Sequence, residues 1–177
     1  MRKLAIAATL LSAFPAFVQA HGGPLRAELI GYEEVPAVAT RADGMFEARV
    51  ARDGQSVAYT LAYAGLQGTI TQAHIHFAQK SVNGSIVVWL CGTGTTTTAG
   101  PTGTPTCPQS GTVSGTFTSA NVLASSTTQQ LAAGDLATFI DAMQSGVAYV
   151  NVHTSLSPGG EIRGQVGSRG HGRGHHH

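Results

Sequence analysis

Apolar and polar residues alternate along short stretches through most of this chain. Alternation with a period of two is typical of β-strands that bury one face. Eight stretches fit this pattern or are rich in β-branched and aromatic residues: 25–30, 44–51, 56–64, 69–77, 85–90, 111–118, 147–153 and 161–166. Turn signals such as Asp53-Gly54 and Asn83-Gly84 separate most of them. The pattern predicts an antiparallel β-sandwich or flattened barrel of about eight strands, with one helix.

The predicted helix comes from a segment with a different period. Apolar residues recur three or four positions apart within 128–144, at Leu131, Leu136, Phe139, Ile140 and Met143. Gly146 is a stop signal, and Gly134 is a candidate interruption. We therefore predict a helix over 128–144, broken near Gly134, whose apolar side packs against the core.

The first residues have the composition of a secretory signal peptide. Arg2 and Lys3 precede an apolar run over 4–18, which is too short for a membrane anchor, and Val18-Gln19-Ala20 offers a small-residue cleavage site. We expect residues 1–20 to be the signal peptide, 21–167 one domain, and 168–177 a disordered tail rich in Gly, Arg and His. The expected location is the periplasm or the extracellular medium.

Charge and motifs narrow the function classes. Cleavage after Ala20 leaves eight Lys and Arg against nine Asp and Glu, a net charge of about −1 with neutral histidines. Nucleic acids and anionic membranes are therefore not expected partners. The sequence has no Gly-X-Ser-X-Gly element, phosphate loop or dinucleotide fingerprint. These observations favour a binding protein over an enzyme.

The two cysteines, Cys91 and Cys107, enclose a loop of about 15 residues that is almost entirely Gly, Thr and Pro. In an exported protein such a pair is typical of a disulfide. The alternative is a metal site shared with histidines, but the loop contains no second ligand. We prefer the disulfide.

Three of the eight histidines lie within the predicted strands: His74 and His76 in one, His153 in another. Because side chains two residues apart share a strand face, His74 and His76 project together. If the second strand lies alongside, three neutral nitrogen donors converge, a set that suits copper or zinc. We predict a metal site there, with copper favoured and zinc as the alternative, because affinity rises from nickel to copper and falls at zinc.

A simpler interpretation remains beside the metal site. A His-X-His pair can be an ordinary hydrogen-bonded polar face, and His153 can hold a turn through its ring nitrogens. Glu161 and Arg163 share a face of the last predicted strand and either form a surface ion pair or lie near the histidines, supporting a ligand or facing an anion. His21, the first residue after cleavage, is a candidate auxiliary copper ligand through its amine and imidazole.

Three motifs in order resemble the CHRD domain, a repeat first described in chordin and found in bacterial exported proteins: 31–36 (GYEEVP), 73–76 (AHIH) with Asn83-Gly84, and 149–154 (YVNVHT) running into 159–165 (GGEIRGQ). The resemblance covers about residues 25–166 and implies an extracytoplasmic β-rich domain. In chordin the domain belongs to a binder of growth factors. A non-catalytic module for protein interaction or adhesion is therefore an alternative function.

A second similarity concerns only the site. A His-X-His pair followed by a late histidine, in an exported β-domain with one disulfide, is similar to the copper ligand pattern of Cu/Zn superoxide dismutases. Arg163 would take the anion-guiding role there. The chain has no counterpart to the histidine that bridges copper and zinc in those enzymes. A copper-dependent dismutase-like oxidoreductase is the third candidate function.

Overall fold

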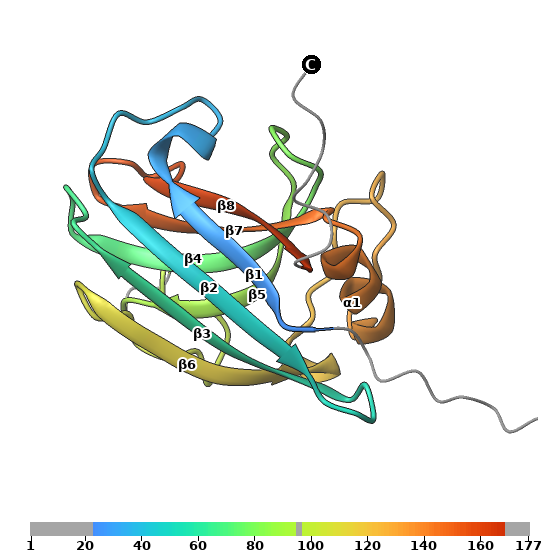
Figure 1. The fold of residues 1–177 in the computed structure, drawn as a ribbon. Helices are drawn as coiled ribbons and strands as arrows, with labels where there is room; N and C mark the ends of the chain where they lie inside the picture. Colours follow the sequence, from blue (N-terminus) through green and yellow to red (C-terminus); the bar gives the residue numbers. More distant parts are fainter. Residues whose placement is uncertain (1–22, 95–96, 169–177) are drawn as a thin grey trace, which may run out of the picture.

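The computed structural model describes residues 23–94 and 97–168 (Figure 1). The described elements, in chain order, are β1 (Leu25–Ile30), η1 (Gly31–Glu33), β2 (Asp43–Val50), β3 (Ser56–Ala64), β4 (Ile70–Phe77), β5 (Ser85–Gly92), β6 (Gly111–Thr118), η2 (Ser119–Asn121), α1 (Leu136–Gln144), β7 (Ala148–Thr154) and β8 (Ile162–Ser168). The predicted signal peptide, His21 and residues 169–177 lie outside the described residues.

The strands form one antiparallel sheet in the order β5-β4-β7-β8-β1-β2-β3-β6. The sheet curls into a nearly closed barrel, so that its two edge strands, β5 and β6, approach each other (Figure 1). The mainly β prediction with one α-helix is confirmed for the described part of the chain.

Alternation explains most of the strands. In β3, Val57, Tyr59, Leu61 and Tyr63 are buried, while the residues between them are exposed or half-buried. The buried set fills the barrel. β7 differs because all seven of its residues are buried. Other parts of the protein must therefore cover the outer face of β7, whereas the outer face of β3 is exposed to solvent or half-buried.

Three links span the seam between β5 and β6. The Tyr59 hydroxyl donates a hydrogen bond of 2.8 Å to the Leu90 carbonyl, which ties β3 to β5. The predicted disulfide between Cys91 and Cys107 is present, and Gly92 forms an isolated bridge to Thr106. The loop before β6 is thus fastened to β5, which protects an edge that would otherwise offer unpaired backbone groups.

The predicted helix over 128–144 is too long. In the structure α1 begins only at Leu136, with Asp135 as its N-cap accepting a hydrogen bond from the Thr138 amide. Upstream, Gln130 and Gly134 have positive φ angles of 58° and 81°, which a right-handed helix cannot contain. Leu131 is nevertheless buried. Its helical spacing reflects core packing and not helical backbone.

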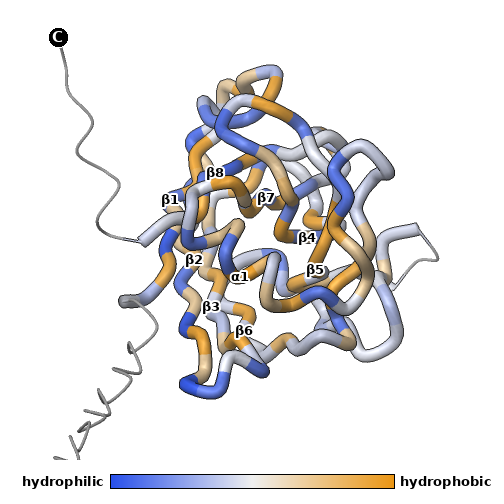
Figure 2. The backbone as a smooth tube through the Cα atoms, turned by 90° about the vertical axis from the view of Figure 1, so that its right-hand side faces the viewer, coloured by the Kyte–Doolittle hydropathy of each residue, from blue (hydrophilic) through white to orange (hydrophobic). Residues whose placement is uncertain are grey.

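α1 closes one end of the barrel, as the end-on view shows (Figure 2). Its buried residues Leu136, Phe139, Ile140 and Met143 face the core, and it contacts β7 and β8. Among the residues that the structure describes, none of the helices has the length and hydropathy that crossing a bilayer requires.

Replacing Cys91 and Cys107 by Ser should lower the free energy of unfolding by about 3 kcal/mol, because the loop can then open freely in the unfolded chain. Urea titration of the variant and of the oxidised, unsubstituted protein measures the difference. Alkylation of the latter without reductant should modify neither thiol. Equal stability of the two proteins, or two alkylated cysteines, would contradict the assignment.

Candidate metal centre

The two faces of β4 have different environments. Ala73 and Ile75 point into the hydrophobic core of the barrel, while His74 and His76 lie on the opposite face. All four side chains are buried, and His74 has no exposed surface. The sheet is thus covered on its outside where the histidines project.

β7 lies directly beside β4, which brings the third histidine to the same place. The antiparallel register pairs Gln72 with His153, His74 with Asn151, and His76 with Tyr149. The ring centroids of His74 and His153 are 4.8 Å apart, and those of His74 and His76 are 5.4 Å apart. One nitrogen from each imidazole lies within 4.8 Å of the others. The structure therefore brings the three predicted histidines together.

β5 contributes an aromatic neighbour to this cluster. Its pairing with β4 shifts register between Ala73 and His74 and again between Ile75 and His76. Such irregularities re-aim side chains. Here Trp89 lies opposite His74, with ring centroids 4.3 Å apart and the planes nearly perpendicular.

Three loops cover the histidines: residues 31–40 after β1, 78–84 between β4 and β5, and 155–160 between β7 and β8. The first two are tied together by the Lys80–Glu33 ion pair and by the hydrogen bond from the Asn83 amide to the Val35 carbonyl. The first and third meet where the Glu34 carboxylate contacts the Gly160 backbone. These contacts bury a polar cluster outside the hydrophobic core.

Backbone carbonyls in these loops orient two of the imidazoles. His76 Nδ1 lies 3.0 Å from the Gly84 carbonyl oxygen, and His153 Nδ1 lies 2.8 Å from the Pro158 carbonyl oxygen. A carbonyl only accepts, so each Nδ1 carries the proton and each Nε2 presents a lone pair. Metal-binding histidines are typically held in this way, with the other ring nitrogen donating to a carbonyl. Neither nitrogen of His74 has a hydrogen-bond partner.

Burial keeps the three imidazoles in the uncharged form that binds metals. Loss of hydration lowers the pKa of His74 to about 2 and that of His76 to about 4. Repulsion between the rings adds to this effect at both residues. The pKa of His153 is also lowered by burial, against the opposing effect of the Pro158 carbonyl.

The spacing of the nitrogens is close to that of a metal site. An ion at the centre of a triangle with sides of 4.8 Å would lie about 2.8 Å from each corner. Zinc binds imidazole nitrogen at about 2.0–2.1 Å. The rings would therefore close in by roughly 0.7 Å at most, a shift within reach of side-chain rotation.

Arg163 contacts the cluster indirectly, through the ring of Tyr149. Its guanidinium carbon lies 3.3 Å from the centroid of the Tyr149 ring, and that ring stacks on His76 at 4.5 Å with an interplanar angle of 2°. Because β7 lies between β4 and β8, the Tyr149 ring is placed between His76 of β4 and Arg163 of β8. Arg163 also donates hydrogen bonds to Asn83 Oδ1 and to the Val82 carbonyl. Its donors thus hold the loop that carries Gly84.

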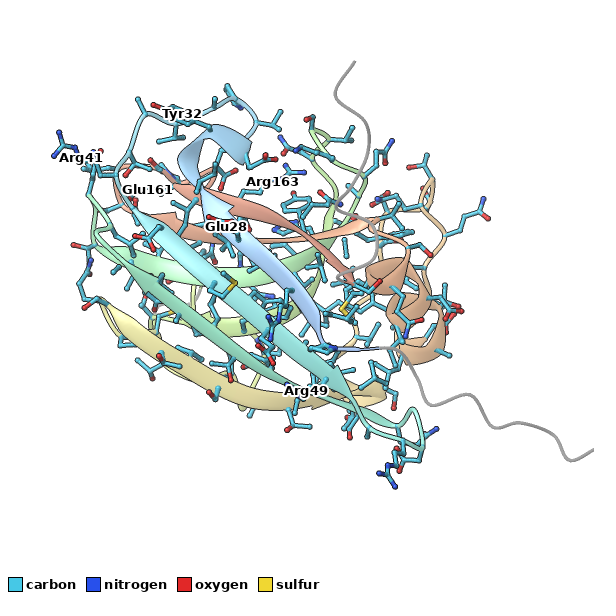
Figure 3. The ribbon with its side chains drawn as sticks, viewed as in Figure 1. Glu28, Tyr32, Arg41, Arg49, Glu161 and Arg163 are labelled. Carbon is cyan, nitrogen blue, oxygen red and sulfur yellow. A yellow bond between two sulfur atoms is a disulfide. The ribbon has the colours of Figure 1, made fainter. Side chains whose placement is uncertain are left out.

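Glu161 is directed elsewhere. Its carboxylate accepts hydrogen bonds from the Thr40 and Thr154 hydroxyls and from the backbone amides of Gln67 and Gly68. The labelled side chains of Glu161 and Arg163 lie apart in Figure 3. Glu161 therefore fastens the loop between β3 and β4, and the hydrogen bonds of its carboxylate go to that loop and its neighbours.

Glu34 is a member of the site that sequence reasoning missed. Its side chain is 6% exposed, and desolvation raises its pKa to about 7, although the positive charge of Arg163 opposes the shift. The only signal in the sequence is its place in the GYEEVP motif, which gives no indication that it is buried.

Fold and site together define a single antiparallel β-barrel domain with a hydrophobic interior and a buried histidine cluster on its outer face. The family model of the CHRD domain matches residues 25–166, which is most of the chain. The chain belongs to the CHRD domain family, as its motifs predicted. Comparison with curated proteins and with solved structures gives no match.

Acidification should destabilise the metal-free protein. The pKa of His76 is about 4 in the folded protein and 6.5 in the unfolded chain, so the unfolded chain binds a proton at this residue before the folded protein does. The free energy of unfolding therefore falls as the pH falls from 6.5 to about 4. From about pH 7 to about pH 4.5 this residue should account for a loss on the order of 2 kcal/mol. Urea unfolding with chelator at both pH values measures it, and His76→Gln should reduce the loss.

Glu34 provides a control of opposite sign. Its pKa is raised from 4.5 to about 7 in the folded state, so its contribution to stability is present at low pH and lost as the pH rises through 7. Glu34→Gln should therefore make the destabilisation on acidification larger. An unchanged pH dependence in both variants would contradict the assigned protonation states.

Proposed function

We propose that this CHRD-domain protein binds one transition-metal ion through His74, His76 and His153. The observation that carries the proposal is the geometry of the cluster: three buried imidazoles have one nitrogen each within 4.8 Å of the others, and two of them have Nδ1 held on a backbone carbonyl. A buried lone pair without a partner costs free energy. A bound cation would satisfy all three.

Copper is the favoured ion and zinc the alternative. Imidazole nitrogen suits both, and copper stands above zinc in the order of affinities for a given site. Carboxylate ligands, which would favour magnesium, calcium or manganese, are not among the three residues of the cluster.

The proposed role is metal binding and not catalysis. In a dismutase-like site, the guanidinium of Arg163 would have to be free to guide an anion to the metal. The Arg163 guanidinium is instead engaged by the Tyr149 ring, Asn83 and Val82, and the residue is 1% exposed. This arrangement favours a supporting role for Arg163.

We further propose that the protein is exported and acts in the periplasm or outside the cell. The signal-peptide composition of residues 1–20, the disulfide and membership of a family whose domains are typically extracellular support this. In that oxidising location copper and a disulfide are compatible.

Metal titration tests the site. His21, His171, His175, His176 and His177 are replaced by Ala in the full chain, so that they cannot contribute. This protein should bind one equivalent of Cu²⁺ or Zn²⁺, and His76→Ala or His153→Ala should weaken binding at least tenfold, because each removes one of three ligands. Calorimetry and metal content after gel filtration measure the effect.

Gln165→Ala is the matched control. Gln165 is a half-buried polar residue of β8 that donates hydrogen bonds to the Ala78 and Gly146 carbonyls, and its removal should leave metal affinity unchanged. Equal binding by the parent and both histidine variants, or no binding by the parent, would rule out the proposed function.

Export is tested separately by expression of the full chain in a bacterium with a periplasm. We expect the periplasmic fraction to contain a protein that begins at His21, since the predicted cleavage site follows Ala20. Intact mass and N-terminal sequencing identify it. A chain retained in the cytoplasm with Met1 intact would refute this part of the proposal.

A further inference from the structure

The side chain of Asn151 lies among the three histidines. Asn151 is on the same face of β7 as His153 and is paired with His74 across to β4. Its Oδ1 is 2.9 Å from His153 Nε2. Its side chain also raises the pKa of His74 and of His76 against the larger effect of burial, although neither ring has a hydrogen bond to it of ordinary geometry.

The contact between Asn151 and His153 brings two lone pairs together. Because His153 Nδ1 donates its proton to the Pro158 carbonyl, Nε2 is an acceptor. The amide Oδ1 that faces it is an acceptor too. Two acceptors at 2.9 Å repel unless a cation lies next to both. Two ligand atoms on one tetrahedral ion, each about 2.0–2.2 Å from it, lie roughly 3.4 Å apart, so these two acceptors would need to separate by only about 0.5 Å to share one.

Glu34 sets the orientation of the amide. The Asn151 Nδ2 group and Glu34 Oε1 crowd the same point beside Gly160, whose lack of a side chain makes room for both. A carboxylate attracts the NH₂ end of an amide and not its oxygen. Nδ2 is therefore turned toward Glu34, and Oδ1 toward the imidazoles.

We propose that Asn151 Oδ1 is the fourth ligand of the metal and that Glu34 is the positioning residue that holds it there. The inference rests on the proposed function and deepens it, because it makes the site a four-coordinate set of three nitrogens and one oxygen. Such a set suits the divalent ions Cu²⁺ and Zn²⁺. Cu⁺, which prefers sulfur ligands, is disfavoured.

Gln72 is the competing amide. It lies on the same face of β4 as the histidines, opposite His153, and its Oε1 is buried without a hydrogen-bond partner. The structure gives it no hydrogen bond to any of the three rings, whereas Asn151 Oδ1 already lies 2.9 Å from His153 Nε2. Asn151 is therefore assigned, and Gln72 becomes the matched control.

The test uses Co²⁺ as a spectroscopic probe in the full chain with the five other histidines replaced. Four-coordinate Co²⁺ absorbs strongly in the visible, and higher coordination by water weakens the bands. In Asn151→Leu water can take the vacated position and keep the ion four-coordinate, so the bands should shift and not vanish, and Co²⁺ and Zn²⁺ should bind at least tenfold more weakly. Gln72→Leu should leave both spectrum and affinity unchanged.

A swapped pair tests the role of Glu34. Glu34→Leu should weaken binding by about 10- to 100-fold, as removal of a group that orients a ligand typically does. In the double variant Glu34→Gln with Asn151→Asp, one carboxylate oxygen at position 151 can bind the metal. The other can accept a hydrogen bond from the new amide at position 34, so that donor and acceptor are exchanged. The double variant should recover the tight Co²⁺ binding of the parent protein, and an affinity as low as that of Asn151→Leu would overturn the role of Glu34.

The outcomes separate the two proposals. If the parent protein binds no metal, the proposed function fails. If the parent binds, and Asn151→Leu keeps its spectrum and affinity while remaining folded by circular dichroism, only the fourth ligand is refuted. Shifted bands and weaker binding in Gln72→Leu alone would assign the oxygen to Gln72 and overturn the inference.

Discussion

The antiparallel pairing of β4 with β7 is the constraint on which the histidine site depends. The hydrophobic face of this pair, with Ala73, Ile75, Val150 and Val152, belongs to the barrel core. A slip of one residue would turn Ile75 outward and bury a histidine among apolar side chains. The core therefore fixes the register, and the register fixes which outer side chains are neighbours. The geometry of the site is set by packing on the other side of the sheet.

The positions of the strands and part of the histidine site could be predicted from the alternation of apolar and polar residues alone. Alternation locates the strands, and it places His74 and His76 on one face of their strand. The order of the strands in the sheet could not be predicted, because no residue pattern in β4 or β7 indicates that these two strands pair with each other. The burial of Glu34 depends on three loops meeting, which no local pattern encodes. The helix was overextended because Leu131 has helical spacing, while the positive φ angle of Gln130 leaves no trace in the sequence.

The outer cluster costs stability. Among the described residues, seven buried side-chain atoms have no hydrogen-bond partner, and five of them lie around this site: both nitrogens of His74, His76 Nε2, Glu34 Oε1 and Gln72 Oε1, the other two being Arg26 Nε and Gln165 Oε1. Each such atom costs about 1–3 kcal/mol. The barrel core, the disulfide and the tied loops offset this. Native proteins tolerate unsatisfied groups chiefly where a ligand or a reaction uses them.

Trp89 is the only tryptophan of the chain, and its ring lies 4.3 Å from that of His74. Nearly all long-wavelength ultraviolet emission of the protein therefore originates beside the histidine cluster. A paramagnetic, redox-active ion there would quench this emission by electron or energy transfer, whereas a closed-shell d¹⁰ ion would leave it bright. The indole is thus a built-in optical probe that distinguishes the electronic type of an occupant.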